Sequence, residues 1–357
     1  MIKTPGYISA LKPYVPGKPI EEVERELGIS KSIKLASNEN PLGPSPMAVG
    51  AVRQAGPELN RYPESGGFKL TEKLSELHGV DNDQIILGNG SNELLNIISY
   101  TYLSDNESAV MATPSFVIYP LATQSAGARP VMIPLTDFRH DLKKMAEAIG
   151  DDTKLVFIAN PNNPTGTINT GKEFDEFMKL VPEGILVVVD EAYYEYVTAD
   201  NYPDTLKYLR QGRDIIILRT FSKIYGLAGL RIGYGIAPGE IISDLNKVRA
   251  PFNTNSIAQA AALAALDDKE HVKKSKVLNE EGKVFLYNQL GSLGIDFVPT
   301  EANFIYITPG DISSERLFNE LLKKGVIIRP MGENAVRVTI GTPEENGKFI
   351  DALKEVI

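Results

Sequence analysis

Short apolar runs alternate with stretches of helical spacing through the middle of the chain. The runs are apolar at consecutive positions, and therefore on both faces of a strand, as a sheet covered by helices on both sides requires. They lie at residues 85–87, 109–111, 155–158, 185–189 and 215–218. This alternation predicts an α/β fold with a mainly parallel sheet.

The two ends of the chain follow other patterns. The first forty residues are rich in Pro and Gly and predict an arm with one short helix over 20–27. After about Asn255, a long helical region precedes two predicted strands, 303–307 and 335–340. A last helix should begin at Thr342-Pro343-Glu344-Glu345, which offers an N-cap, a Pro at the first helical position and a capping-box Glu.

These patterns predict two domains and an arm, since 357 residues exceed the size of one small core. The arm and part of the small domain occupy 1–41, the large domain 42–255, and a smaller α+β domain 256–357.

Composition excludes several classes of function. The 37 Lys and Arg against 46 Asp and Glu give a net charge of −9, which argues against nucleic acid or an anionic membrane as the main partner. The chain has no Cys and three widely spaced His, so we expect no disulfide, zinc cluster or Ser-His-Asp triad, and no bound metal. It has neither a signal-peptide core nor an apolar stretch of about 18 residues, which predicts a cytoplasmic location.

Polar residues, Gly or Pro follow the apolar runs. In open α/β sheets ligands bind outside the carboxyl ends of the strands, so these loops are the expected site. They are 88–91, 113–114, 160–164, 190–191 and 220–223.

Lys223 follows one of these runs and is well placed to form a Schiff base. Considered alone, a lysine at this position is more often a solvated charge at a strand end. Arg231 lies 8 positions further on, between glycines, and a cofactor with an aldehyde and a phosphate needs both an amine and a cation.

Asp190 closes the run 185–189, so its backbone should be buried. A carboxylate there could keep the nitrogen of a pyridine ring protonated, and Tyr193 could donate a hydrogen bond to a ring hydroxyl. The other interpretations are a helix N-cap for Asp190 and a core or surface aromatic for Tyr193.

Two loops suit polar ligands. Gly88-Asn89-Gly90-Ser91-Asn92-Glu93 leads into a helix and can admit an anion, although Ser91 could be a plain N-cap; it does not match the dinucleotide pattern G-x-G-x-x-G. Asn160-Pro161-Asn162-Asn163-Pro164-Thr165-Gly166 specifies an irregular loop, either a tight surface turn or a shaped site in which Asn163 offers an amide.

Taken together, these motifs resemble the fold-type I pyridoxal-phosphate aminotransferases, and the likeness covers nearly the whole chain. Order, spacing and residue types agree across 160–166, Asp190-Glu191-Ala192-Tyr193, Ser222-Lys223 and Arg231. Within that family the chain is most similar to the histidinol-phosphate branch. The segments that carry this closer likeness are 11–19, 35–41, 60–63 and 328–330.

The resemblance implies a large domain with a mostly parallel seven-stranded sheet, and a role for each candidate residue. Lys223 would bind the cofactor and later move a proton, Asp190 would pair with the ring nitrogen, and Tyr193 and Asn163 would bind the ring oxygen. Phe116 would stack on the ring, where many relatives have Tyr. The phosphate would be held by Ser91, Asn92, Ser222 and Arg231, joined by Tyr62 of a second subunit.

The resemblance also implies the reaction. Histidinol phosphate and 2-oxoglutarate would give imidazole acetol phosphate and glutamate in a homodimer with shared active sites, with Tyr14, Asn163, Arg329 and Arg337 on the substrate. Arg329 and Arg337 could instead be exposed strand-end charges, and Tyr14 could anchor the arm. Other possible functions are an aromatic amino acid aminotransferase, a phosphothreonine decarboxylase, a nucleotide-binding dehydrogenase and a catalytically silent binding module.

Overall fold

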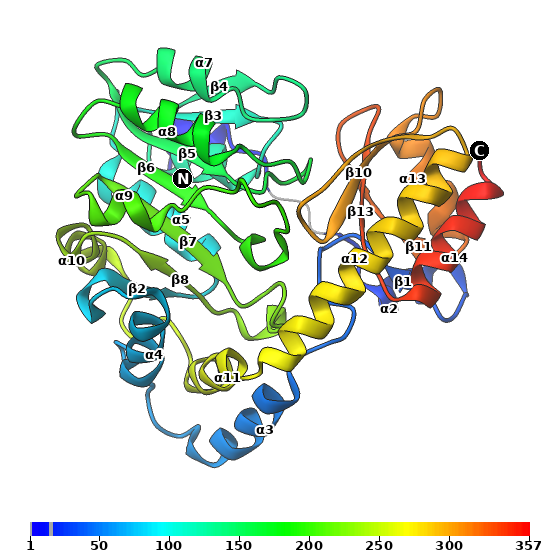
Figure 1. Ribbon diagram of the computed structural model, residues 1–357, viewed down its shortest axis with the longest axis horizontal. Helices are drawn as coiled ribbons and strands as arrows, with labels where there is room; N and C mark the ends of the chain where they lie inside the picture. Colours follow the sequence, from blue (N-terminus) through cyan, green and yellow to red (C-terminus); the bar gives the residue numbers. More distant parts are fainter. Residues whose placement is uncertain (1, 14–16) are drawn as a thin grey trace.

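A seven-stranded sheet forms the centre of the larger part of the molecule (Figure 1). The computed structural model describes residues 2–13 and 17–357. The strand order is β2-β8-β7-β6-β5-β3-β4, and β8 alone runs antiparallel to its neighbours β2 and β7. The strands are β2 (Ile85–Gly88), β3 (Ser108–Thr113), β4 (Arg129–Pro134), β5 (Thr153–Ala159), β6 (Leu186–Asp190), β7 (Ile215–Thr220) and β8 (Gly233–Ile236). The predicted α/β class and mostly parallel sheet are confirmed.

The apolar runs did not reveal β4 and β8, for different reasons. β4 is an edge strand with no buried residue, and its apolar segment Val131-Met132-Ile133 lies between Pro130 and Pro134. Proline is unfavourable inside a sheet and found mainly on edge strands, so this segment did not indicate a strand. β8 is short and contains Gly233 and Gly235. A Cβ at Gly233 would lie 2.6 Å from the Ser91 backbone nitrogen, so glycine is needed where this strand passes the start of α5.

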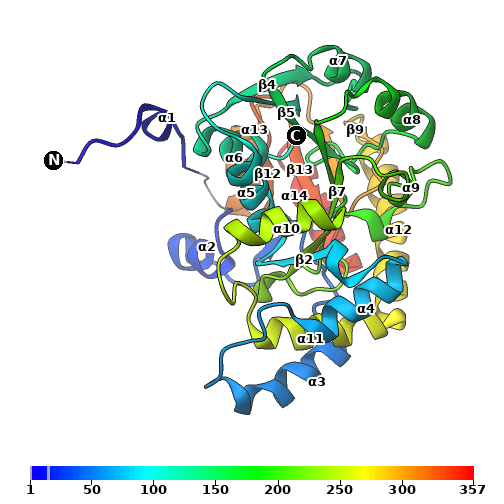
Figure 2. The same cartoon turned by 90° about the vertical axis from the view of Figure 1, so that its left-hand side faces the viewer.

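Helices cover both faces of this sheet, as the two-sided apolar runs require. Residues of α5, α6 and α10 pack against one face. In Figure 2, α5 and α6 lie to the left of the sheet and α8 and α9 to its right. Residues of α3, α4, α7, α8, α9 and α11 pack against the other. These helices are α3 (Pro46–Ala55), α4 (Phe68–His78), α5 (Ser91–Tyr102), α6 (Ile118–Ser125), α7 (Leu142–Glu147), α8 (Gly171–Leu180), α9 (Leu206–Arg210), α10 (Gly239–Val248) and α11 (Ser256–Asp267). Short 3₁₀ turns cover Gly56–Glu58, Asn82–Gln84, Tyr194–Tyr196 and Ala228–Leu230.

A smaller antiparallel sheet, β12-β13-β10-β9, forms a second core. Its strands are β9 (Asp296–Val298), β10 (Phe304–Thr308), β12 (Arg329–Pro330) and β13 (Val336–Thr339). The surrounding helices are α12 (Lys269–Ser292), α13 (Ser314–Lys323) and α14 (Pro343–Lys354). The predicted capping box is present, because the Glu345 N–H donates to Thr342 Oγ and the Thr342 N–H donates to Glu345 Oε2.

The N-terminal segment contributes to this smaller part. α2 (Ile20–Leu27) coincides with the predicted helix, and β1 (Ile33–Lys34) pairs in parallel with β11 (Val326–Ile327). Before it, α1 (Gly6–Ser9) lies on an arm that extends outwards beside α6 (Figure 2). Among the described residues no helix combines the length and apolar character of a membrane span.

The long helix α12 connects the two parts of the molecule (Figure 1). Before it, α11 packs against α3 and α4, which belong to the large sheet, whereas the later turns of α12 contact α14 and β9. The division at residues 41 and 255 stays a prediction.

Candidate active site

A cavity of about 290 Å³ lies at the carboxyl ends of the large-sheet strands, against β12 and β13 of the smaller sheet. Eleven of the thirteen residues predicted for the site line it: Ser91, Asn92, Phe116, Asn163, Asp190, Tyr193, Ser222, Lys223, Arg231, Arg329 and Arg337. Tyr62 lies elsewhere, and Tyr14 falls outside the described residues. Side chains separated by almost 250 positions in the sequence therefore meet at one place.

Lys223 lies three residues beyond β7, and its side chain crosses towards the N-terminal segment. Its Nζ donates a hydrogen bond to the Ser37 carbonyl oxygen at 3.3 Å and lies 5.4 Å from the centre of the Tyr193 ring. The amine is thus directed into the cavity and not outwards as a solvated strand-end charge.

Asp190 is the last residue of β6 and is only 6% exposed. Burial raises the pKa of its carboxyl to about 6, although hydrogen bonds from Tyr119 and the Ala192 N–H and the positive charge of Lys223 oppose this rise. The Tyr119 hydroxyl donates to Oδ2 at 2.9 Å, and the Ala192 N–H donates to Oδ1 at 3.2 Å. The second contact resembles a cap, but no α-helix follows. A buried carboxylate of this kind gains from a cationic partner.

An anion-binding corner lies at the other end of the cavity. Ser91 and Asn92 are the first residues of α5, whose free backbone N–H groups favour negative charge. Gly90 has φ +76°, and a Cβ there would lie 2.4 Å from Arg231 Nη2, so glycine is required for this close approach. Arg231 Nη1 donates to Ser222 Oγ at 3.3 Å, which brings a cation and a hydroxyl to the helix N-terminus.

The loop over residues 160–166 is held in one shape by the side chain of Asn162. Asn162 Oδ1 accepts hydrogen bonds from Ser115 Oγ at 2.8 Å and from His140 Nε2 at 3.0 Å, while its Nδ2 donates to Thr165 Oγ1 at 2.9 Å. Burial lowers the pKa of His140 to about 4, so its ring is neutral and donates through Nε2 at neutral pH. The loop is therefore a shaped site rather than a surface turn.

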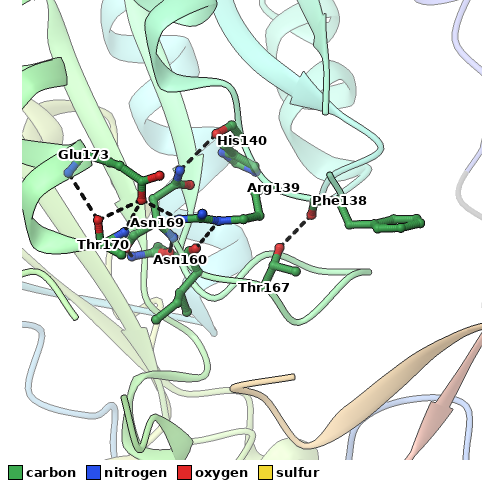
Figure 3. A network of polar contacts seen from close by, with 9 residues as sticks. Phe138, Arg139, His140, Asn160, Thr167, Asn169, Thr170 and Glu173 are labelled. Atoms are coloured by element: carbon green, nitrogen blue, oxygen red, sulfur yellow. Dashed lines mark hydrogen bonds and ion pairs between the residues drawn. The ribbon is translucent and has the colours of Figure 1, made fainter. Parts of the chain in front are cut away.

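A second network of hydrogen bonds joins this loop to the residues around it (Figure 3). Asn160 Oδ1 accepts from the Asn169 N–H at 2.8 Å, and Asn169 Nδ2 donates to the His140 carbonyl at 2.9 Å. Glu173 accepts from the Thr170 N–H at 2.7 Å and pairs with Arg139. The polar groups of the loop are thus bonded within the protein, which leaves Asn163 to face the cavity.

Asn163 and Arg337 meet across the cavity from the two parts of the molecule. Arg337 Nη1 donates to Asn163 Oδ1 at 2.5 Å and Nη2 donates to the Ala36 carbonyl at 2.7 Å. Arg337 is 9% exposed and Arg329, its neighbour across β12 and β13, is half-buried, so neither is an exposed strand-end charge. The paired N–H donors of an arginine suit phosphate and carboxylate ligands.

Gly166 ends the loop at the junction of the two parts. It has φ +74°, and a Cβ would lie 1.9 Å from Thr300 Oγ1. Its carbonyl oxygen accepts from the Glu301 N–H at 2.8 Å. The final glycine of the motif therefore allows the loop to dock directly on the segment that leads into β10.

Tyr62 is 84% exposed and stacks on Phe252, with ring centres 4.8 Å apart. It does not line the cavity of its own chain. This position is compatible with a contact to a second subunit, and its role stays a prediction.

Sequence reasoning missed Tyr119 and Asn38. Tyr119 lies on α6, stacks on Phe157 with ring centres 5.1 Å apart, and holds Asp190. Asn38 Nδ2 donates to the Tyr193 hydroxyl at 2.9 Å. Tyr119 gave no signal because an aromatic in an apolar helix usually indicates core packing. Asn38 lies in segment 35–41, where polar residues follow the apolar pair Leu35-Ala36, and that pattern could have identified it.

Comparison with known proteins agrees with this geometry. A histidinol-phosphate aminotransferase of Moorella thermoacetica is 53% identical over 98% of this chain and 92% of its own length. One named histidinol-phosphate aminotransferase 2, of Carboxydothermus hydrogenoformans, is 48% identical over 97% of both chains. The crystal structure of the Sinorhizobium meliloti histidinol-phosphate aminotransferase in complex with pyridoxal 5'-phosphate superposes with a TM-score of 0.92. It is 28% identical and covers 100% of this chain and 98% of that one.

The family described as aminotransferase class I and II matches residues 30–353, which is nearly the whole chain and includes every candidate residue except Tyr14. The fold and the cavity agree with that match. The molecule has two parts, and the cavity contains the Lys223 amine, the Asp190 carboxylate and the anion-binding corner. The chain belongs to the class I and II aminotransferases.

Proposed function

We propose that the protein is a pyridoxal-phosphate-dependent transaminase for histidinol phosphate and 2-oxoglutarate, which gives imidazole acetol phosphate and glutamate in histidine biosynthesis. The observation that carries the proposal is that Lys223, Asp190 and the anion-binding corner with Arg231 line one cavity. The names of the relatives at 53% and 48% identity support the substrate.

The donor set of the cavity fits pyridoxal phosphate. The α5 N-terminus with Ser91, Asn92, Ser222 and Arg231 suits a phosphate, and the buried Asp190 suits a protonated ring nitrogen. Phe116 lines the cavity edge-on to Tyr119, with ring centres 5.7 Å apart, and offers an aromatic surface. When bound, the cofactor supplies an aldehyde that joins to amines and a ring that accepts electrons.

The position of each residue in the cavity determines its proposed role. Lys223 Nζ holds the cofactor and later carries a proton between the reacting carbon atoms of substrate and cofactor. Asp190 keeps its carboxylate at the ring nitrogen, and Tyr193 and Asn163 bind the ring oxygen. Arg337, Arg329 and Tyr14 bind the substrate anions, with Asn163 beside Arg337.

A panel of amino donors and keto acceptors tests the proposal. Histidinol phosphate, glutamate, phenylalanine and phosphothreonine would be compared by kcat/KM, with carbon dioxide release measured for the last. We expect histidinol phosphate to be preferred. A preference for phenylalanine would identify an aromatic aminotransferase, and carbon dioxide release would identify a decarboxylase.

Replacing Arg329 should affect phosphorylated substrates selectively. Arginine forms paired charge-assisted hydrogen bonds, each worth roughly 1.5–3 kcal/mol, so Arg329→Ala should lower kcat/KM for histidinol phosphate by roughly 10–150-fold. Phenylalanine should lose less, because it has no phosphate, and Tyr14→Phe should show the same bias more weakly. Arg329→Lys, which keeps the charge but loses the paired donors, should fall in between. Equal losses for both substrates would contradict a phosphate contact.

We further propose a homodimer in which Tyr62 reaches the cofactor phosphate of the partner subunit. Its exposure outside its own cavity supports this assignment, and twofold symmetry would make the contact reciprocal. The cytoplasmic location stays a prediction.

Mixed dimers provide the measurement for a shared site. Co-expression of a Tyr62→Ala chain with a Lys223→Ala chain should place both lesions in one site of each mixed dimer and leave the other intact. The purified mixed dimer should therefore have about half the wild-type activity, well above either parent. Activity no higher than that of the parents would contradict the shared site.

A further inference from the structure

Asn38 lies on the N-terminal segment that crosses the cavity, and its side chain is bonded to Tyr193. Asn38 Nδ2 donates to the Tyr193 hydroxyl oxygen at 2.9 Å, and Asn38 is 1% exposed. An amide nitrogen donates and does not accept, so the phenol oxygen is the acceptor in this contact. The proton of the Tyr193 hydroxyl must then be donated in another direction.

The orientation of the Asn38 amide is fixed by Thr339 on β13. Thr339 Oγ1 accepts from the Asn38 N–H at 2.9 Å and donates to Asn38 Oδ1 at 3.1 Å. The carbonyl end of the amide therefore faces Thr339, and the amino end faces Tyr193. Asn303 Nδ2 also donates to the Asn38 carbonyl at 3.0 Å. Asn38 has φ +56°, a conformation that asparagine tolerates better than most side chains.

The surroundings of Tyr193 direct its free proton into the cavity. The ring packs edge-on against Phe304, with centres 5.1 Å apart, and Lys223 Nζ lies 5.4 Å from the ring centre. Asn38 occupies one side of the hydroxyl, and both residues line the cavity. A ligand in the cavity would therefore accept a hydrogen bond from the Tyr193 hydroxyl.

We propose that Asn38 is a positioning residue that makes Tyr193 a donor, and not an acceptor, towards the ring oxygen of bound pyridoxal phosphate. This inference rests on the proposed function. Without Asn38 the Tyr193 hydroxyl could rotate and offer its proton elsewhere, including to a neighbouring water. Asn38 thereby acts on the cofactor through Tyr193 without touching it.

A donor at the ring oxygen has a consequence that absorbance can measure. The hydrogen bond stabilises the negative charge on the ring oxygen. A proton on the nearby nitrogen that joins Lys223 to the cofactor is then bound less tightly, so the pKa of that nitrogen falls. Loss of the donor should raise the pH at which the visible absorbance of the bound cofactor changes. It should also weaken cofactor binding by about two- to tenfold, the effect of one hydrogen bond.

The experiment compares Asn38→Gly, Tyr193→Phe and the double variant, each purified and loaded with pyridoxal phosphate. Glycine removes the donor and fits the backbone at φ +56°. We expect Asn38→Gly to shift the absorbance midpoint upwards, by less than Tyr193→Phe does. In the Tyr193→Phe background the same change should produce no further shift.

Matched variants keep the test independent of folding defects. Asn106→Gly, at an exposed asparagine with φ +72°, should leave the midpoint unchanged. Thr339→Val should shift the midpoint in the same direction as Asn38→Gly. Thr339→Ser, which keeps the hydroxyl, should have the wild-type midpoint. An unshifted midpoint in Asn38→Gly, or additive shifts in the double variant, would overturn the inference. Failure of the wild type to bind the cofactor would instead refute the proposed function.

Discussion

Lys223→Ala should reduce the rate of transamination by about 10²–10⁴-fold, the usual cost of losing a general acid–base group. The Lys223 amine is directed into the cavity by its hydrogen bond to the Ser37 carbonyl, at 3.3 Å. Alanine leaves the anion corner at Arg231 and the carboxylate of Asp190 in place, so the variant should still bind pyridoxal phosphate. Single-turnover kinetics with histidinol phosphate, followed by absorbance, would measure the loss.

Two controls test whether the loss of activity comes from the missing Lys223 amine. Lys143→Ala, at a lysine whose side chain is 80% exposed, should have wild-type rates. Added small primary amines should restore part of the activity of Lys223→Ala, because they can carry the proton that Nζ no longer carries. Near wild-type turnover in Lys223→Ala without an added amine would remove Lys223 from the mechanism.

The strands with continuous apolar runs could be predicted because they are buried on both faces, where the sequence has no freedom to be polar. The ligand end of the sheet followed from the same pattern. Of the eleven residues that line the cavity, Phe116, Arg329 and Arg337 were instead implied by the resemblance to a known family. β4 was not predicted because Pro130 and Pro134 flank its short apolar segment, and this edge strand has no buried residue. β8 could not be predicted because its glycines are fixed by contacts with other elements, such as the 2.6 Å approach of a Gly233 Cβ to Ser91.

Contacts between side chains that are distant in the sequence could not be predicted either, because they too depend on how separate elements pack. The bond between Asn38 and Tyr193 joins residues 155 positions apart, and that between Thr339 and Asn38 joins residues 301 apart. Such pairs leave no periodicity in the chain. The motifs identified which residues carry the chemistry, while only the folded arrangement shows which residues hold them.

Asp190→Asn should slow the chemical step by about 10²–10³-fold, a loss comparable to removal of one preorganised electrostatic partner. The substitution keeps the shape of the side chain and its place beside Tyr119, whose hydroxyl lies 2.9 Å from Oδ2. It removes the negative charge that stabilises a protonated ring nitrogen, and with it the ability of the ring to accept electrons. Half-reaction rates with histidinol phosphate and with glutamate would report the change.

The pH dependence of cofactor binding gives a second measure of the same charge. Burial raises the pKa of Asp190 to about 6 in the cofactor-free protein, so its carboxyl is mainly charged above pH 6 and mainly neutral below it. Pairing with a protonated ring nitrogen is therefore available above that pH and weakens as the pH falls through it. A phosphate group also titrates near pH 6, so the useful quantity is the difference between wild type and Asp190→Asn. The wild type should lose more affinity than the variant between pH 7 and pH 5.

A surface aspartate provides the control for this prediction. Asp175 also accepts a hydrogen bond from a tyrosine hydroxyl, that of Tyr208 at 2.6 Å, but it does not line the cavity. Asp175→Asn should therefore leave half-reaction rates and cofactor affinity unchanged. Tyr119→Phe should act in the same direction as Asp190→Asn but less strongly, since it removes a hydrogen bond to the carboxylate and leaves the charge. If Asp190→Asn has wild-type half-reaction rates, Asp190 only accepts the hydrogen bonds of Tyr119 and the Ala192 N–H, and the electron-accepting ring must be stabilised by another group.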